Sequence, residues 1–206
     1  MATETHSRTG AEFSYEYPSR VTVLFGAFTA VAVLGWLVST FLTGIHLWAL
    51  PLPETVEPSG SMLVITSEWA YVLGVPLALF GALYYLVTIL MAGFWFETRH
   101  PLIIKLLTPI TASGVVASSM FVYLQLFVIE AICPFCMVSA AATVVLFGLE
   151  LSILKTSDLP SLSVLLDDPA APLRGLTVTW PLLMAVTGLL AIGAFYAVTL
   201  APVPGT

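Results

Sequence analysis

Residues Leu106–Leu154 read LLTPITASGVVASSMFVYLQLFVIEAICPFCMVSAAATVVLFGLELSIL, which is two apolar segments joined by a very short connection. Each segment is long enough to cross a bilayer as a helix. A connection this short predicts a tight antiparallel helical hairpin. The only two cysteines of the chain, Cys133 and Cys136, lie where the second segment begins, so we expect the hairpin to hold both thiols at the membrane surface.

The rest of the 206-residue chain is just as apolar. Hydrophobic residues make up 59% of it and charged residues only 9%, a composition that water-soluble domains do not have. Runs long enough to span a membrane recur five times, at Val21–Leu42, Ala70–Phe94, Leu106–Val128, Cys136–Leu154 and Leu176–Leu200. The predicted fold class is therefore an all-α integral membrane protein with five transmembrane helices.

The charged residues predict how the spans are oriented. With an odd number of spans, all basic residues fall on one side, at Arg8, Arg20, Arg99, Lys105, Lys155 and Arg174. The other side receives acidic residues and no lysine or arginine, at Glu54, Glu57, Glu68 and Glu130. The positive-inside rule then predicts a multi-pass protein of the cell (inner) membrane, with a cytoplasmic N-terminus and with the C-terminus and the cysteine pair outside the cytoplasm.

This orientation predicts the organisation of the chain. The order is a flexible cytoplasmic tail over 1–20, a helical bundle over 21–155, a cytoplasmic linker over 156–175, a fifth transmembrane helix over 176–200 and an extracytoplasmic tail over 201–206. Membrane lipid is then the main surrounding of the protein. The absence of a basic patch from the sequence argues against nucleic acid as a partner.

The spacing of the two cysteines favours redox chemistry. Two thiols in a Cys-x-x-Cys pair can close into a disulfide, and a helix N-terminus favours the reactive thiolate. An extracytoplasmic compartment tolerates such a disulfide. The alternatives are two small apolar core residues or a zinc site, and zinc would need further ligands that the nearby sequence lacks.

Polar residues within the spans are expected to face the interior of the bundle, because polar groups are costly in lipid. They are Thr108, Thr111, Ser113, Ser118, Ser119, Tyr123 and Gln125 in the third span and Tyr84 and Tyr85 in the second. Small hydroxyl residues also serve as plain helix-packing residues. Glu130 is expected either to influence the thiols or to mark the water boundary. For His46 an interfacial position is expected, with a proton relay as the alternative.

Several motifs together resemble the vitamin K epoxide reductase family. They are SMLVITSEWAYVLGVP over Ser61–Pro76, the following Leu77-Ala-Leu-Phe-Gly81 with Tyr84, Gly35, Ser39 and Thr43 in the first span, and Tyr123-Leu-Gln with Cys133-Pro-Phe-Cys136 and Ser139-Ala140. The similarity covers most of Gly35–Gly148. It implies a four-helix bundle around a quinone of the ubiquinone or menaquinone type, with a fifth helix in bacterial-type members, which oxidise protein thiols and pass the electrons to that quinone.

The resemblance implies roles for individual residues. Cys136 would be the sulfur nearer the quinone, and Cys133 would exchange with an incoming thiol, supplied by an extracytoplasmic thioredoxin-like protein. Ser67 matches a loop hydroxyl that can hydrogen-bond the quinone. The alternative for Ser67 is an N-cap of the second span. Tyr123 and Gln125 are further candidates for contacting the quinone oxygens.

The chain departs from the family at the first extracytoplasmic loop. Members normally carry a second cysteine pair there, which relays electrons to the inner pair. Ser61 stands at the position of its second cysteine, and nothing near Thr55 supplies the first. The predicted function is a membrane thiol:quinone oxidoreductase. The alternative is a non-catalytic membrane assembly or interaction protein that kept the fold and lost the relay.

Overall fold

The computed structural model describes residues 17–48, 59–157, 159–161, 165, 184–185 and 187–189. Its long helices are α1 (Ser19–Trp48), α3 (Leu77–Thr98), α4 (Pro101–Phe127) and α5 (Pro134–Thr156). The shorter elements are the helix α2 (Ser61–Thr66), the 3-10 helix η1 (Glu68–Ala70) and the antiparallel pair of strands β1 (Tyr71–Val72) and β2 (Val75–Pro76).

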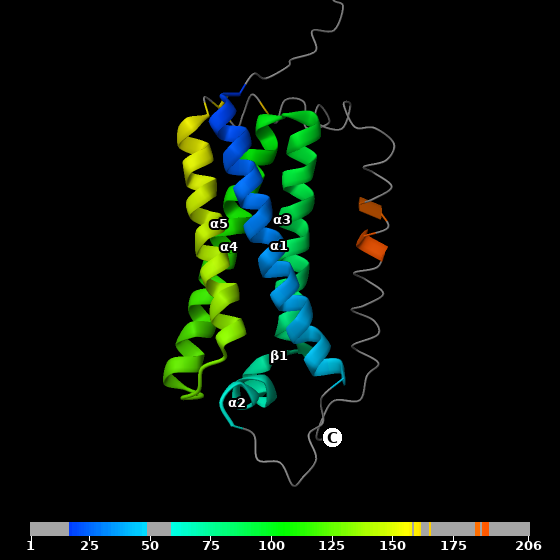
Figure 1. Cartoon of the computed structure of the whole chain (residues 1–206), viewed down its shortest axis with the longest axis vertical. Coiled ribbons are helices and arrows are strands. Elements are labelled where there is room, and N and C mark those ends of the chain that lie inside the picture. The colour runs from blue at the N-terminus through cyan, green and yellow to red at the C-terminus, as the bar shows by residue number, and fades with distance from the viewer. Residues whose placement is uncertain are drawn as a thin grey trace, which may run out of the picture.

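The four long helices form one bundle. α1 packs against α3 and α5, and α4 packs against the same two helices, so each long helix has two neighbours (Figure 1). All four are long and apolar enough to cross a bilayer. The protein is therefore an all-α, multi-pass membrane protein.

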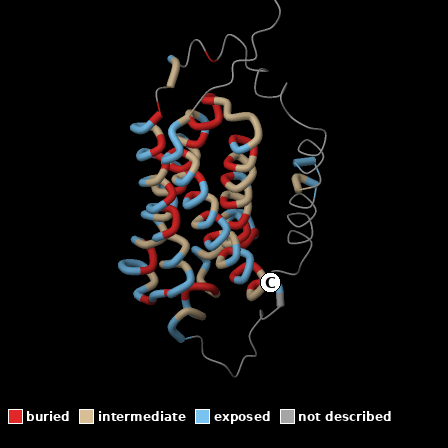
Figure 2. The backbone as a smooth tube through the Cα atoms, turned by 45° about the horizontal axis from the view of Figure 1, so that its top comes forward, coloured by how far each residue is buried: buried red, intermediate tan, exposed pale blue. Residues whose placement is uncertain are grey.

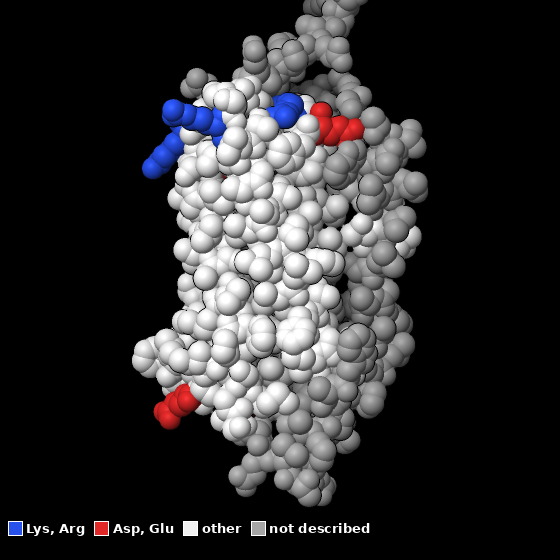
Figure 3. All heavy atoms as spheres, in the orientation of Figure 1, with Lys and Arg blue, Asp and Glu red and all other residues white. Residues whose placement is uncertain are grey.

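The two ends of the bundle differ in charge. Lysine and arginine side chains gather at one end in Figure 3, where α1 begins, α5 ends and α3 turns into α4. The described basic residues are Arg20, Arg99, Lys105 and Lys155, and we call this the basic end. The opposite end carries α2, η1 and the strand pair, and we call it the loop end. Within the described residues the loop end has Glu68 and Glu130 but no lysine or arginine.

The turn between α3 and α4 is tight because specific residues end the first helix and begin the second. Arg99 takes a left-handed conformation (φ 52°) and its N–H donates to the carbonyl of Trp95, which ends α3. α4 begins with Pro101 at its first position, where a missing N–H costs nothing. The His100 ring accepts from the N–H of Leu102 at 3.2 Å and caps the helix.

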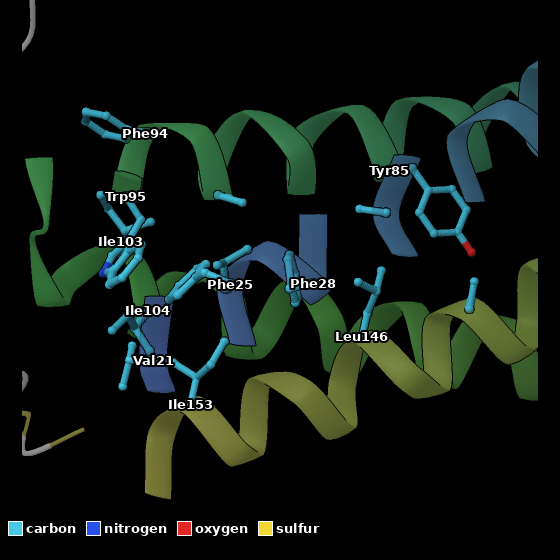
Figure 4. Close-up of a cluster of buried hydrophobic side chains, with 14 residues drawn as sticks. Val21, Phe25, Phe28, Tyr85, Phe94, Trp95, Ile103, Ile104, Leu146 and Ile153 are labelled. Atoms are coloured by element: carbon cyan, nitrogen blue, oxygen red, sulfur yellow. The ribbon is translucent and has the colours of Figure 1, made fainter. Parts of the chain in front are cut away.

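The core is dense toward the basic end (Figure 4). The rings of Phe25 and Trp95 stack with centroids 3.9 Å apart, and the Arg99 guanidinium lies 4.4 Å from the centroid of the Trp95 ring. Ile103 and Ile104 of α4 are almost fully buried in the same cluster. Buried positions follow the inward faces of the helices in Figure 2, so packing of these faces holds the bundle together.

The expected spans match the helices to within six residues at each end, except at two places. The second span was expected from Ala70, but α3 begins only at Leu77. The apolar residues before it form η1 and the strand pair, whose turn holds Leu73 (φ 53°) and Gly74 (φ 80°), and two positive φ angles are the mark of a hairpin turn rather than a helix.

The second place is the fifth span. Of residues 176–200 the structure describes 184–185 and 187–189, which are helical. The remainder of that span lies outside the described residues. So do residues 1–16 of the expected tail, residues 49–58 of the first loop, most of the linker and residues 201–206.

Candidate active site

Gln125 fastens the short loop that leads into the thiol pair. It is buried near the end of α4. Its backbone carbonyl accepts from the N–H of Ala131 at 3.1 Å, and its side-chain Oε1 accepts from the N–H of Cys133 at 2.8 Å. One residue thus holds the loop at two points, and this sets the position of Cys133 above the first turn of α5.

The two cysteines have different surroundings. Cys133 is the N-cap of α5, with Pro134 at the first helical position. It is fully buried in a small cluster with Leu42 of α1 and with Val64 of α2. Cys136 lies in the first turn of α5 and is only partly buried.

The Cys133 thiol is adapted to ionise. Hydrogen bonds to its sulfur lower the pKa of the thiol, and the Cys136 thiol makes the largest contribution. Burial opposes this effect. Smaller contributions come from the backbone N–H groups of Cys136 and Phe135 and from the Ser61 hydroxyl. The thiolate is the reactive form of cysteine. The Ser61 hydroxyl is thus one of the groups near enough to Cys133 to lower the pKa of its thiol.

A cavity of about 350 Å³ occupies the bundle toward the loop end. All four long helices line it, and α2 and η1 contribute to its wall at the loop end. Its described lining contains no Asp, Glu, Lys or Arg. Most of the residues singled out from the sequence lie on its wall, namely Cys136, Ser67, Gln125, His46, Tyr84, Tyr85, Ser113 and Ser118. A largely apolar cavity with a few polar groups is the usual form of a site for a small organic ligand.

Two glycines shape this cavity by letting side chains approach the opposite helix. A Cβ at Gly114 of α4 would collide with the Tyr84 hydroxyl and come within 2.8 Å of Thr143 Cγ2. A Cβ at Gly81 of α3 would lie 3.0 Å from Ser39 Oγ. Gly114 therefore makes room for a tyrosine hydroxyl between α3, α4 and α5.

The polar groups of the wall differ in whether they have partners. Tyr85 donates to the carbonyl of Ser139 at 2.6 Å and lies 2.9 Å from Thr143 Oγ1. His46 shares its Nδ1 with the carbonyl of Leu42 at 2.8 Å. In contrast, His46 Nε2 and the Tyr84 hydroxyl are buried without a hydrogen-bond partner.

The family model described as "Vitamin K epoxide reductase family" matches residues 27–151, more than half of the chain. The chain belongs to the vitamin K epoxide reductase family. Membership indicates a membrane redox function, because the family generally consists of oxidoreductases that act with quinones. A search of curated proteins found no match for the chain.

The vitamin K epoxide reductase fold brings together most of the residues expected from the sequence. Cys133 and Cys136 adjoin, and Cys136, Ser67 and Gln125 share the cavity wall. Tyr123 is not brought to the wall; it is 56% exposed and its ring lies against Phe127 on the outside of α4.

One further expectation needs correction. Ser67 does not cap the second span, because α3 has Pro76 at its N-cap and Ser67 lies between α2 and η1. The Ser67 hydroxyl instead donates to the carbonyl of Val64 at 2.8 Å. His46 lies near the loop end of α1, where it is 8% exposed and on the cavity wall.

One buried acid was not singled out from the sequence. Glu150 of α5 is fully buried, and its Oε1 accepts from the Thr108 hydroxyl at 3.1 Å while Oε2 has no partner. A carboxyl group inside an apolar span, here four residues before its expected end at Leu154, is itself the signal that would have pointed to it. Glu130, by contrast, is exposed at the loop end and takes no part in lowering the pKa of Cys133.

Proposed function

We propose that this protein is a thiol:quinone oxidoreductase that couples protein disulfide formation to reduction of a quinone of the ubiquinone or menaquinone type. One observation carries the proposal: Cys136 lies on the wall of an apolar cavity within the bundle, and it packs against the buried cluster that contains Cys133 on the loop side. Such a pair can take electrons from a thiol on the loop side through Cys133 and deliver them to a ligand in the cavity through Cys136.

Cys133, Cys136 and Gln125 have separate roles in this proposed reaction. An incoming protein thiolate attacks the Cys133 sulfur of the oxidised pair, which forms a mixed disulfide and releases Cys136 as a thiol. The second thiol of that protein then closes the protein's own disulfide and releases Cys133, whose lowered pKa makes it a good leaving group. The reduced pair returns to its disulfide by giving up two electrons and two protons, which a quinone bound beside Cys136 would accept. Gln125 keeps the N–H of Cys133 and hence its sulfur in place.

The cavity fits a quinone ring by its chemistry. Its wall is apolar and carries no charged side chain among the described residues. Among the residues of the wall, Tyr84 has a buried hydroxyl without a partner within the protein. A ring oxygen of a quinone can accept a hydrogen bond from such a hydroxyl.

The orientation is part of the proposal. The basic end faces the cytoplasm of a cell (inner) membrane and the loop end lies outside, as the charge difference between the ends supports. A thioredoxin-like protein in that compartment is then the proposed thiol donor. A membrane-impermeant thiol reagent should label the reduced pair in intact cells, and labelling only after the cytoplasmic face is opened would refute the orientation.

A second candidate function is a non-catalytic assembly or interaction protein of the same fold. Ser61 favours it, since a serine at the sulfur of Cys133 cannot relay electrons. The complete burial of Cys133 favours it as well, because an incoming thiol has to displace α2 before it reaches the sulfur.

Reduction of ubiquinone-1 by the purified full chain separates the two functions. Dithiothreitol and a reduced thioredoxin-like protein serve as alternative donors. We expect turnover that Cys136→Ser abolishes, while Cys133→Ser blocks exchange with protein thiols. Wild-type activity in both variants, or no activity in the parent with either donor, would favour the interaction protein.

Ser61→Cys tests whether α2 still belongs to the redox machinery. Because the Ser61 side chain already lies at the Cys133 sulfur, the introduced thiol should form a disulfide with Cys133 under mild oxidation. Ser59→Cys, placed just before α2, is the matched control. Equal cross-linking from both positions, or none from either, would count against the proposed electron path over this loop.

A further inference from the structure

Gln125 has the only carboxamide side chain of the protein, whose sequence contains one glutamine and no asparagine. An amide oxygen accepts hydrogen bonds, and an amide nitrogen can only donate them. The oxygen of Gln125 is occupied, because Oε1 accepts from the N–H of Cys133 at 2.8 Å. The nitrogen Nε2 has no hydrogen-bond partner among the described residues. One end of this amide is therefore used and the other is free.

The hydrogen bond to Cys133 decides which way round the amide lies. A backbone N–H can only donate, so the atom of Gln125 that faces it has to be the oxygen. Turning the amide over would set the Nε2 protons against the Cys133 N–H. Gln125 Nε2 is thus a hydrogen-bond donor in a fixed place.

The free nitrogen can be reached from the cavity. Gln125 lies on the cavity wall and is only 3% exposed. Two other polar atoms of wall residues, His46 Nε2 and the Tyr84 hydroxyl, are fully enclosed without a partner, and Gln125 Nε2 is not enclosed in this way. Since the cavity is the open space that Gln125 borders, its amide protons are available to a molecule inside the cavity.

A ligand atom at this nitrogen also lies close to the thiol pair. The bond between Gln125 and Cys133 places the last turns of α4 beside the start of α5. Cys136 follows Cys133 by three residues, a rise of about 4.5 Å along the helix. Cys136 and Gln125 both line the cavity. A ring that meets the amide nitrogen can therefore lie beside Cys136.

Two hydroxyls of the wall are less suited to a ligand oxygen that only accepts. The Ser67 proton is used on the carbonyl of Val64 and the Tyr85 proton on the carbonyl of Ser139. A ligand oxygen would have to replace these internal hydrogen bonds. At Gln125 Nε2 a ligand oxygen displaces no hydrogen bond of the protein, so the full value of the new bond goes into binding.

We propose that the Gln125 carboxamide joins ligand binding to the thiol pair: Nε2 donates a hydrogen bond to a carbonyl oxygen of the bound quinone while Oε1 holds the N–H of Cys133. This assignment rests on the proposed function and deepens it. Gln125 becomes a specificity-determining residue, because an atom that only donates favours a ring with a carbonyl oxygen over the same ring without one. A bound ring also restrains the amide at both ends, and the amide then holds the loop before Cys133 more firmly.

The hydrogen bond to the ligand is tested by removing each of its partners. The full chain in lipid nanodiscs is titrated with ubiquinone-1 and with the same prenylated ring without its two carbonyl oxygens. Quenching of tryptophan fluorescence follows ubiquinone-1, since Trp69 lies on the wall, and displacement of ubiquinone-1 follows the oxygen-free ring. Gln125→Leu should weaken ubiquinone-1 roughly twofold to tenfold and leave the oxygen-free ring unchanged.

Tyr123→Phe is the matched control, because Tyr123 lies two residues away on the outside of α4. It should change the affinity of neither ligand. Equal weakening of both ligands in Gln125→Leu, or of neither, would overturn the hydrogen bond to the ligand.

The hold on Cys133 has a readout that needs neither ligand nor turnover. Cys136→Ser leaves Cys133 as the only thiol of the protein. Iodoacetamide at about pH 9.5, above the ordinary cysteine pKa of about 8.5, then reports how often this buried sulfur becomes accessible. Adding Gln125→Leu should speed alkylation roughly twofold to tenfold. Gln125→Glu keeps an acceptor for the Cys133 N–H and should react no faster than the Cys136→Ser background. Background rates in Gln125→Leu, or equal acceleration in both variants, would overturn the hold on Cys133.

The coupling itself is tested by adding ubiquinone-1 to the same variants. Cys133 is not on the cavity wall, so a ligand there does not cover its sulfur directly. Saturating ubiquinone-1 should slow alkylation in the Cys136→Ser background and have no effect once Gln125→Leu is added. Slowing that persists without the amide would overturn the coupling. If the parent chain binds no ubiquinone-1, the proposed function fails together with the coupling, whereas a parent that binds and a Gln125→Leu variant that behaves like it overturn this assignment alone.

Discussion

Toward the basic end, the four long helices meet around Phe25 and Trp95, whose rings stack 3.9 Å apart. Toward the loop end, the same helices enclose a cavity of about 350 Å³ whose wall includes Cys136. Packing is dense in the first half and left open in the second. In a membrane, helices associate mainly through such packing and not through exclusion of water.

The difference shows how one bundle can be both stable and functional. The dense half can carry the stability, and the open half can hold a ligand. Buried polar atoms without partners occur in both halves, at His46 and Tyr84 beside the cavity and at Trp95 Nε1 and Glu150 Oε2 in the dense half. Unpartnered groups are costly, and they persist where the rest of the fold compensates. Comparable substitutions in the dense half and in the open half can test whether the two halves differ in their contribution to stability.

The largest effect is expected from truncating the dense half. Trp95→Ala should lower the free energy of unfolding by about 3–5 kcal/mol, since Trp95 is fully buried. Phe80→Ala removes a 38% exposed ring from the cavity wall and should cost less than about 2 kcal/mol. Thermal midpoints and denaturant unfolding in detergent give both values. Equal losses would mean that the two halves do not differ in their contribution.

A smaller effect is expected where the halves meet. A Cβ at Gly35 of α1 would overlap the Tyr85 ring, so Gly35→Ala should cost about 3 kcal/mol, the upper value typical of overpacking. Gly148→Ala is its control in α5, where a Cβ meets nothing within 4 Å; it should be neutral or gain up to about 1 kcal/mol. If Gly35→Ala melts like the parent, then the close contact of α1 with Tyr85 is not needed.

The apolar runs and the cysteine spacing were enough to predict the four long helices and the position of the thiols. They could not separate the residues before Leu77 from the span behind them, because a hairpin turn at Leu73 and Gly74 is as apolar as a helix. Hydrophobicity indicates that a residue is buried or in contact with lipid, but it does not indicate where the backbone changes direction.

The candidate site was less predictable because it depends on which face of each helix points inward. Tyr123 and Gln125 are two residues apart and therefore about 200° apart around α4, so both could not face the cavity; the structure turns Gln125 inward. His46 lies beyond the expected end of the first span, and only the continuation of α1 places it on the wall. Partners across helices, such as Gly114 and Tyr84, need the packed bundle.

The buried Glu150–Thr108 pair sharpens the comparison, because it is a polar contact within the dense half. Thr108→Val should destabilise the protein by about 1–2 kcal/mol, since a buried acceptor loses its donor. Adding Glu150→Leu should restore most of the loss, because replacing both partners by apolar groups is often nearly neutral. A double-mutant cycle on thermal stability measures this coupling. Loss of quinone binding in the restored double variant would show that this pair serves the cavity after all.

The smallest effect is expected at the loop end, where Ser61 meets Cys133. Ser61→Ala removes one of the hydrogen bonds that lower the pKa of the Cys133 thiol, so the first apparent pKa of the cysteine pair should rise. A neutral hydrogen bond contributes about 0.5–1.5 kcal/mol, and one pKa unit corresponds to about 1.4 kcal/mol, so the rise should be less than about one unit. The thiolate would then form at higher pH, and thiol exchange would slow most on the acidic side. Ultraviolet titration of the thiolate measures the shift, with Ser59→Ala as the control outside α2. An unchanged titration in Ser61→Ala would mean that the backbone N–H groups and Cys136 alone set the reactivity of Cys133, and the open half would then not depend on α2 for its chemistry.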